Sequence, residues 1–222
     1  MGKPRPTQEQ FKAYEAMYRH FNRILFGARL PPVILNFSRH SGTYGFFAPE
    51  RWGRVRGRGK RVTHEISINP SHLALRDPRD TAATLLHEMC HLWQQDFGDP
   101  PRRGYHDREW AAKMREVGLI PIDPHTGQER NSAHALAHRI DPEGRFAQVF
   151  RKMPREYLLP WKCGEVSRVN GGRGRGGAGG EGSKSRNKVK YSCSGCGANA
   201  WGKPDLDLVC GRCSLRFAEA RS

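Results

Sequence analysis

One short segment of the sequence combines residue types and a spacing that suit hydrolytic chemistry. The segment His87-Glu88-Met89-Cys90-His91 has the pattern HExxH. Side chains four residues apart lie one above the other on a helix, so His87 and His91 can present two imidazole nitrogens to one zinc ion. Glu88 lies about 100° further round the helix, which leaves its carboxylate off the metal but close enough to deprotonate a water molecule there. The pattern therefore predicts a hydrolytic zinc site.

The residues around this segment favour a metal site over two solvent-exposed histidines. Leu85-Leu86 precede the first histidine and Leu92-Trp93 follow the second. A helix with such flanks is expected to be largely buried, and buried histidines without partners would be costly.

A catalytic zinc usually has three protein ligands and one open position, so a third donor must come from elsewhere in the chain. His106 is our candidate, because it follows a loop of prolines and arginines and opens a second helical pattern. A histidine at the start of a helix can turn toward a neighbouring helix. Glu109, Asp107 and Asp96 are the alternatives, since carboxylates serve as third ligands in some zinc hydrolases. Position in the sequence does not exclude them.

Four cysteines near the C-terminus predict a second metal site of a different kind. Cys193-x2-Cys196 and Cys210-x2-Cys213 are separated by thirteen residues, the spacing of a zinc ribbon. Four thiolates leave no open coordination position, so this zinc should be structural. So short a module has no core of its own, and the metal must supply most of its folding energy. Disulfides are the alternative, which a reducing compartment disfavours.

The remaining histidines and cysteines carry weaker signals. His134 and His138 are also four residues apart, but no glutamate follows the first and no third donor is evident. We interpret them as ordinary histidines on the surface of a helix. Cys90 is interpreted as a small buried thiol rather than a nucleophile, and Cys163 as an unpaired cysteine.

The first half of the chain reads as a helix followed by short strands. Thr7 can cap an amphipathic helix that ends near Gly27. Apolar and alternating patterns then predict strands at residues 33–37, 44–47 and 64–69.

The two helices that carry the histidines come next. Asp80 or Thr81 can cap the HExxH helix, which the break at residues 98–101 ends. A further helix begins near His106 and stops at Gly118. The fold class expected is α+β, with an N-terminal helix, a small sheet, the HExxH helix and the third-ligand helix, followed by the ribbon.

Length and composition indicate one core and one small module. The chain has 222 residues and a mean hydropathy of −0.76, which is polar for a globular protein. We expect a catalytic core with a helical extension at residues 7–162, a basic, glycine-rich flexible linker at 163–190 and the ribbon at 191–217. The N-terminus has charges and prolines with no apolar segment behind it, so we expect no secretory signal and a cytoplasmic location, nucleoid-associated in a bacterium or nuclear in a eukaryote.

The charge of the chain predicts a polyanionic partner. The formal net charge is +16 and the pI is about 10.1, which nucleic acid, an anionic membrane surface or an acidic protein would satisfy. No stretch approaches the roughly 18 apolar residues that a membrane span needs. The basic residues of a predicted hairpin in the catalytic half are Arg54, Arg56, Arg58, Lys60 and Arg61.

The ribbon adds aromatic residues beside cations. Trp201, Lys203 and Arg212 have a composition suited to stacking on single-stranded bases and contacting phosphates. The aromatics Tyr191 and Phe217, like Trp201, could equally cover the ribbon's own small core.

Several of these segments occur in the order found in one protein family. The chain resembles the SprT-like zinc metalloproteases of the Spartan type, and the shared segments are Leu25-Phe26-Gly27, Ile66-Ser67-Ile68-Asn69-Pro70, Leu85 to His91, and Gly104-Tyr105-His106. The resemblance implies a zincin-like core in which His87, His91 and His106 bind a catalytic zinc and Glu88 is the base. It also implies association with DNA. One departure is that the family often has His-Gly followed shortly by Phe, where this chain has His106-Asp107 and then Trp110.

The resemblance leads to a functional expectation. We expect a monomeric zinc endopeptidase with one catalytic and one structural zinc, which acts on DNA-bound or DNA-crosslinked proteins and is stimulated by DNA, single-stranded or junction-containing. The oxyanion-stabilising residue stays open among Tyr105, Tyr44 and the basic hairpin. The alternative is a non-catalytic, zinc-containing DNA-binding accessory factor, against which Glu88 counts, because a structural site has no use for that carboxylate. A nucleobase or phosphodiester enzyme is disfavoured, since the carboxylate clusters of two-metal sites and a Pro-Cys-x-x-Cys segment are missing.

Overall fold

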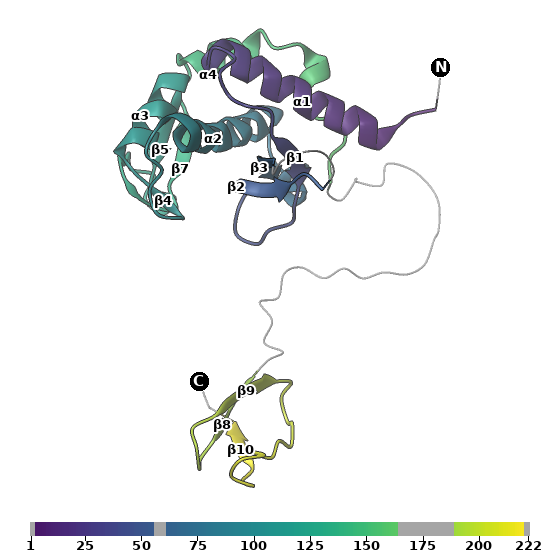
Figure 1. Cartoon of the computed structure of the whole chain (residues 1–222), viewed down its shortest axis with the longest axis vertical. Helices are drawn as coiled ribbons and strands as arrows, with labels where there is room; N and C mark the ends of the chain where they lie inside the picture. The colour runs from purple at the N-terminus through teal and green to yellow at the C-terminus, as the bar shows by residue number, and fades with distance from the viewer. Residues whose placement is uncertain (1–2, 56–60, 164–188, 220–222) are drawn as a thin grey trace. The chain divides into compact units, whose positions relative to one another are not determined.

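The computed structural model describes residues 3–55, 61–163 and 189–219 (Figure 1). The chain divides into two compact units, Met1–Ser167 and Arg168–Ser222, here called the core unit and the ribbon unit. Most of the predicted linker at 163–190 lies outside the described residues, so its flexibility stays a prediction. None of the helices in the described ranges has both the length and the apolar character needed to cross a membrane.

The core unit begins with a long amphipathic helix, α1 (Pro6–Leu25). Pro6 fits the first turn because its missing N–H would have had no partner there. Arg5 occupies the N-cap position and its backbone N–H donates to Glu9, so the prediction that Thr7 caps the helix is wrong. The side chains that α1 buries recur at three- and four-residue steps and include Tyr14, Met17, Tyr18, Phe21 and Leu25.

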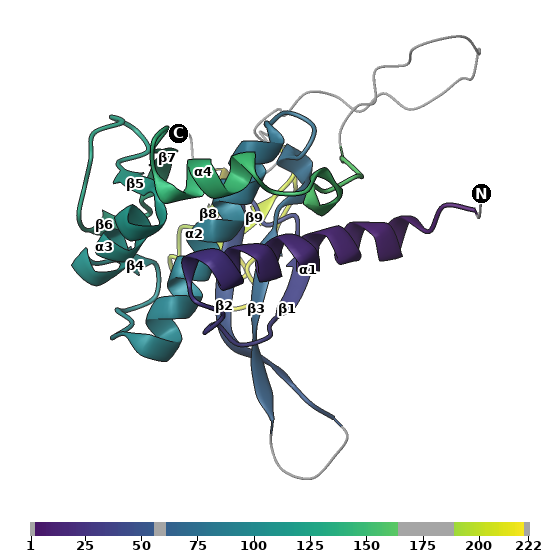
Figure 2. The same ribbon diagram turned by 90° about the horizontal axis from the view of Figure 1, so that it is seen from above.

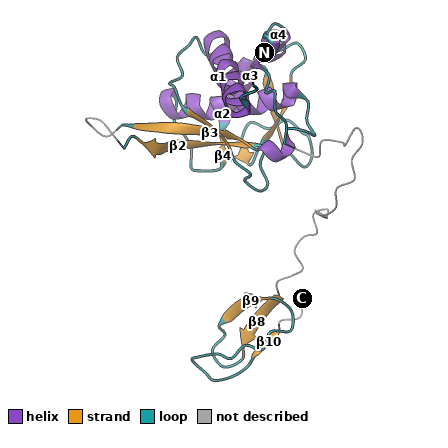
Figure 3. Ribbon diagram, turned by 90° about the vertical axis from the view of Figure 1, so that its right-hand side faces the viewer, coloured by secondary structure: helices purple, strands orange, loops and turns teal. Residues whose placement is uncertain are grey.

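A three-stranded sheet lies against the helices. Its strands are β1 (Ile34–Phe37), β2 (Gly45–Gly53) and β3 (Val62–Ile68), in the order β1-β3-β2. β1 runs parallel to β3, and β2 runs antiparallel to it. Figure 3 shows helices over one face of this sheet, and Figure 2 shows β2 and β3 extending beyond them. β2 is therefore an edge strand in the described part of the chain.

The HExxH motif lies on α2 (Pro78–Phe97), which follows the 3-10 turn η1 (Pro70–His72). Asp77 caps α2, because its side chain accepts a hydrogen bond from the backbone N–H of Arg79. The helix thus begins before Asp80 and Thr81, the residues from which it was predicted to start. Nearly every side chain from Thr81 to Leu92 is buried, as expected of a helix in the middle of a core.

The third-ligand region forms a compact group of short elements at one end of the core unit (Figures 1 and 2). α3 (Arg108–Val117) ends at Gly118, as predicted, and the short helix α4 (Arg145–Arg151) and the turn η2 (Arg155–Tyr157) come later in the chain. β4 (Tyr105–His106) pairs with β6 (Ala133–His134), and β5 (Leu119–Ile122) pairs with β7 (Ala137–Ile140). His134 and His138 therefore lie on strands, and the prediction of helix-surface histidines is wrong.

The ribbon unit is a small antiparallel sheet. Its strands are β8 (Val189–Cys193), β9 (Asn199–Gly202) and β10 (Phe217–Glu219), in the order β10-β8-β9. Only Tyr191, Cys193 and Cys210 are buried among its described residues.

Gly118 allows a stability prediction for the core unit. It ends α3 at φ +94°, and a Cβ added there would lie 2.7 Å from the backbone nitrogen of Phe146. Because backbone cannot move aside cheaply, we expect Gly118→Ala to lower the free energy of unfolding by about 3 kcal/mol. Gly127, at φ +69° with open space around it, is the matched control, and Gly127→Ala should cost about 1 kcal/mol. Urea unfolding of both variants checks this, and equal costs would contradict it.

Candidate metal centres

Three histidines converge in the core unit. His87 and His91 lie on α2 and His106 lies on β4, and one ring nitrogen from each falls within 4.8 Å of the others. The Nε2 atoms of His91 and His106 are 3.2 Å apart. Two nitrogens bound tetrahedrally to one zinc at about 2.0 Å lie about 3.3 Å apart, so His91 and His106 already have the spacing of two zinc ligands.

The three imidazoles are held in the neutral form that binds metals. Burial lowers the pKa of His91 to about 3 and that of His106 to about 4. Burial also lowers the pKa of His87 well below its usual value, and the neighbouring histidines lower it further. Neutral imidazoles offer a lone pair without releasing a proton first.

Trp110 forms a wall against which all three rings pack. Its ring centroid lies 4.8 Å from that of His87, 5.1 Å from that of His91 in a stacked arrangement and 4.3 Å from that of His106. Asp107 caps α3 by accepting the backbone N–H of Trp110. This chain departs from the expected family pattern at Asp107 and Trp110, and both residues thus take part in the packing of the site.

The rival third ligands are engaged elsewhere. The side-chain amide of Gln94 donates to Asp107 and to Glu109, at 2.8 Å in each case. Asp96 pairs with His64 at 3.1 Å. Among the described residues, none of the three carboxylates belongs to the histidine group, so the structure favours His106 over them.

Glu88 is buried beside this group without belonging to it. The backbone N–H of Phe47 on β2 hydrogen-bonds to its carboxylate, yet burial raises the pKa of Glu88 to about 8. Gly45, also on β2, leaves room for Glu88, because an added Cβ would lie 3.3 Å from the carboxylate oxygen Oε1. A cation among the histidines would favour the ionised carboxylate. This is the arrangement expected of a base that does not bind the metal.

His138 is a site residue that sequence reasoning missed. Its Nδ1 atom lies 3.1 Å from Nδ1 of His87. Burial lowers the pKa of His138 to about 4, and the positive charge of Arg76 contributes. The signal that could have found it is the alternation of Leu136, His138 and Ile140, which is typical of one face of a strand.

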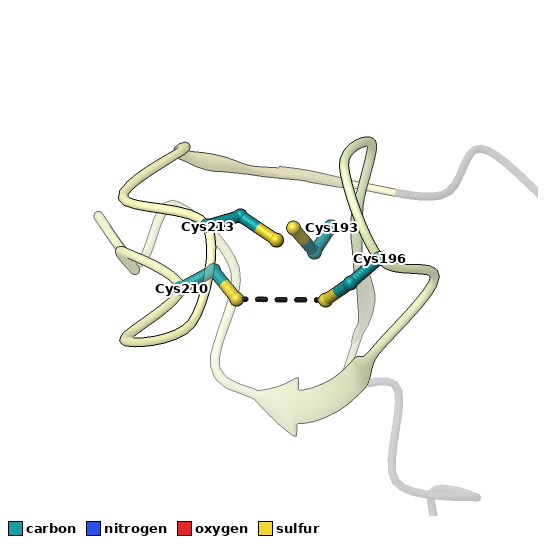
Figure 4. A group of neighbouring side chains, drawn as sticks. All are labelled: Cys193, Cys196, Cys210 and Cys213. Atoms are coloured by element: carbon teal, nitrogen blue, oxygen red, sulfur yellow. Dashed lines mark hydrogen bonds between the residues drawn. The ribbon is translucent and has the colours of Figure 1, made fainter.

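Four cysteine sulfurs converge in the ribbon unit, all within 4.8 Å of one another (Figure 4). Cys196 and Cys210 have their Sγ atoms 3.6 Å apart. Two sulfurs bound tetrahedrally to zinc at about 2.3 Å lie about 3.8 Å apart, which is close to the spacing of this pair. Backbone N–H groups of Arg212 and Cys213 lower the pKa of Cys210 to about 7, which favours the thiolate. The remaining cysteines, Cys90 and Cys163, are free, and Cys90 is fully buried as predicted.

The predicted nucleic-acid contacts are only partly described. Arg54 and Arg61 are exposed and joined by a backbone hydrogen bond of 2.8 Å just beyond the end of β2 and the start of β3, at the end of the hairpin where the two strands are connected. Arg56, Arg58 and Lys60 lie outside the described residues.

In the ribbon unit, Trp201 is 64% exposed, and Lys203 and Arg212 are exposed too. Tyr191 instead packs inside, with its hydroxyl donating to the carbonyl of Lys203. Tyr191 therefore belongs to the small core of the ribbon, whereas the exposed ring of Trp201 is accessible for stacking on bases.

Comparison with known proteins places the core unit in a family. The model of the SprT-like family matches residues 14–140, a span from α1 to β7 that contains the three histidines, Glu88 and His138. No curated protein and no solved structure matches the chain. The match identifies a metallopeptidase-like domain and covers more than half of the chain, which therefore belongs to the SprT-like family.

Proposed function

We propose that this protein is a zinc-dependent endopeptidase with a zincin-like core. The observation that carries the proposal is that two features occur together at one place in the core unit. Three neutral histidines converge at zinc-ligand spacing, and a separate buried carboxylate, Glu88, lies beside them on the same helix.

The residues of the site have distinct roles in this reaction. A zinc ion held by His87, His91 and His106 would polarise the scissile carbonyl and the attacking water. Glu88 takes the proton of the attacking water and then delivers it to the leaving amine. The hydrogen bond from Phe47 and the packing of Gly45 hold the Glu88 carboxylate in place for both transfers.

The edge of β2 offers a place for an extended peptide. The N–H of Phe47 points to Glu88 rather than to β3, so the site borders the edge of β2 that pairs with no other strand in the described ranges. A substrate strand could hydrogen-bond to this edge, as extended peptides do at exposed sheet edges. Such binding uses backbone groups and requires little sequence specificity.

We further propose that the substrates are proteins on DNA. The support is the net charge of +16, the exposed Arg54 and Arg61 in the core unit and the exposed Trp201 in the ribbon unit. DNA that holds both the enzyme and a bound protein would raise the effective concentration of substrate toward about the millimolar range. Proximity would then select the substrate.

The test is incubation of the purified chain with a DNA-binding protein, with and without single-stranded DNA. We expect DNA to stimulate cleavage, and DNA affinity to fall with salt at a log-log slope of roughly −0.7 per phosphate neutralised. Trp201→Ala should weaken binding by about tenfold. The control is Trp161→Ala, which removes an exposed tryptophan of the core unit.

Three outcomes would count against this part of the proposal. They are equal cleavage with and without DNA, DNA binding that does not change with salt, and equal effects of the two tryptophan substitutions. DNA binding without any cleavage would instead favour the non-catalytic accessory factor.

A further inference from the structure

His138 lies where it can control the orientation of a proposed metal ligand. It belongs to β7, opposite Pro121 of β5, and its ring centroid is 5.2 Å from that of His87. The two Nδ1 atoms are 3.1 Å apart, a hydrogen-bonding distance. His138 is not a member of the histidine group whose nitrogens converge. It therefore contacts one member of the group from outside.

Only one of the two possible hydrogen bonds is compatible with metal binding by His87. A neutral imidazole has one N–H and one lone pair. If His87 donates from Nδ1, its Nε2 lone pair is free for a metal. If His87 accepts at Nδ1, its proton is on Nε2 and that nitrogen cannot bind. His138 must therefore accept the bond, for which it must itself be neutral.

The polar neighbours of His138 are held in fixed positions. Arg76, whose positive charge reaches the ring, donates to the hydroxyl of Thr84 at 2.8 Å and to the carbonyl of Asp80 at 3.1 Å, and it stacks over Tyr44 at 4.2 Å. A guanidinium has no lone pair to offer a histidine N–H, so the hydrogen bond at Nδ1 of His138 is the one to His87.

We propose that His138 is a positioning residue, which accepts a hydrogen bond from Nδ1–H of His87 and so directs the Nε2 lone pair of His87 toward the metal. This inference rests on the proposed metal site. Partners of this kind, which bind the second nitrogen of a ligating histidine, typically contribute about 10- to 100-fold to metal affinity.

The experiment compares His138→Leu with His138→Gln in the full-length chain. Leucine fills similar space but cannot accept a hydrogen bond, whereas the carboxamide oxygen of glutamine can. We expect His138→Leu to weaken cobalt and zinc binding at the histidine site by about 10- to 100-fold, and His138→Gln to restore most of the affinity. The exposed His125 gives the control His125→Leu, which should bind like the wild type.

Chelator competition measures the affinities, and cobalt spectra separate the two sites, because thiolate-bound cobalt in the ribbon has charge-transfer absorption that the histidine site lacks. Circular dichroism checks that each variant is folded. Unchanged affinity in His138→Leu, or no recovery in a folded His138→Gln, would overturn the inference. A loss as large as that of His106→Ala would also overturn it, in favour of direct ligation. If the wild-type chain bound metal only at the ribbon, the proposed function itself would fail.

Discussion

Glu88→Gln is expected to lower the rate of peptide-bond hydrolysis by about a thousandfold while the chain keeps two zinc ions. The carboxylate is the proposed base, and an amide cannot take up the proton of the attacking water. Glutamine has the same shape and can still accept the N–H of Phe47. Because burial raises the pKa of Glu88, a neutral side chain there should not destabilise the fold. Initial rates of cleavage and elemental analysis of the purified variant measure both effects.

The matched control is Glu109→Gln. Glu109 lies on α3 and was a rival candidate for the third ligand, but its carboxylate accepts hydrogen bonds from Gln94 and from the backbone of Asp99. We expect this variant to keep its zinc and nearly all of its activity. Wild-type activity in Glu88→Gln would show that another group is the base, and loss of zinc from it would show that Glu88 is a ligand.

Cys193→Ser should unfold the ribbon unit and release one zinc. Structural zinc contributes about 10–16 kcal/mol of apparent binding free energy in small zinc modules. Burial contributes little to the stability of this unit, since only Tyr191, Cys193 and Cys210 are buried among its residues 189–219. The histidine site belongs to the other compact unit, so its metal should stay bound. Elemental analysis should therefore give one zinc per chain, and the fluorescence of Trp201 should change as β9 is lost.

Cys163→Ser is the control for the loss of a thiol. Cys163 is a free cysteine outside both candidate metal groups, and its substitution should leave two zinc ions in place. Release of both metals from Cys193→Ser would contradict the independence of the two units.

Local signals accounted for the parts of the fold that the sequence predicted well. The HExxH helix and the end of α3 at Gly118 follow from apolar periodicity and from a glycine that can adopt a positive φ. Both are decided within a few residues along the chain. The prediction that Asp80 or Thr81 caps α2 was wrong, because Asp77 is an equally good capping residue and the structure uses it.

The parts that were missed depend on partners distant in the sequence. A spacing of four residues suggested a helix for His134 and His138, but pairing of β6 with β4 and of β7 with β5 makes both segments extended. The sequence did point to His106, but what separates it from Asp107 and Glu109 is that these two carboxylates accept side-chain hydrogen bonds from Gln94. A single sequence shows the candidates but not which of them another side chain already binds.

The most direct test of the central claim is mass-spectrometric detection of new peptide termini in a DNA-bound protein after incubation with the zinc-loaded chain. The account predicts internal cleavage products with the wild type, and almost none with Glu88→Gln or after a chelator removes the metal. Products that form equally fast in all three reactions, or in none of them, would contradict the assignment of this chain as a zinc endopeptidase.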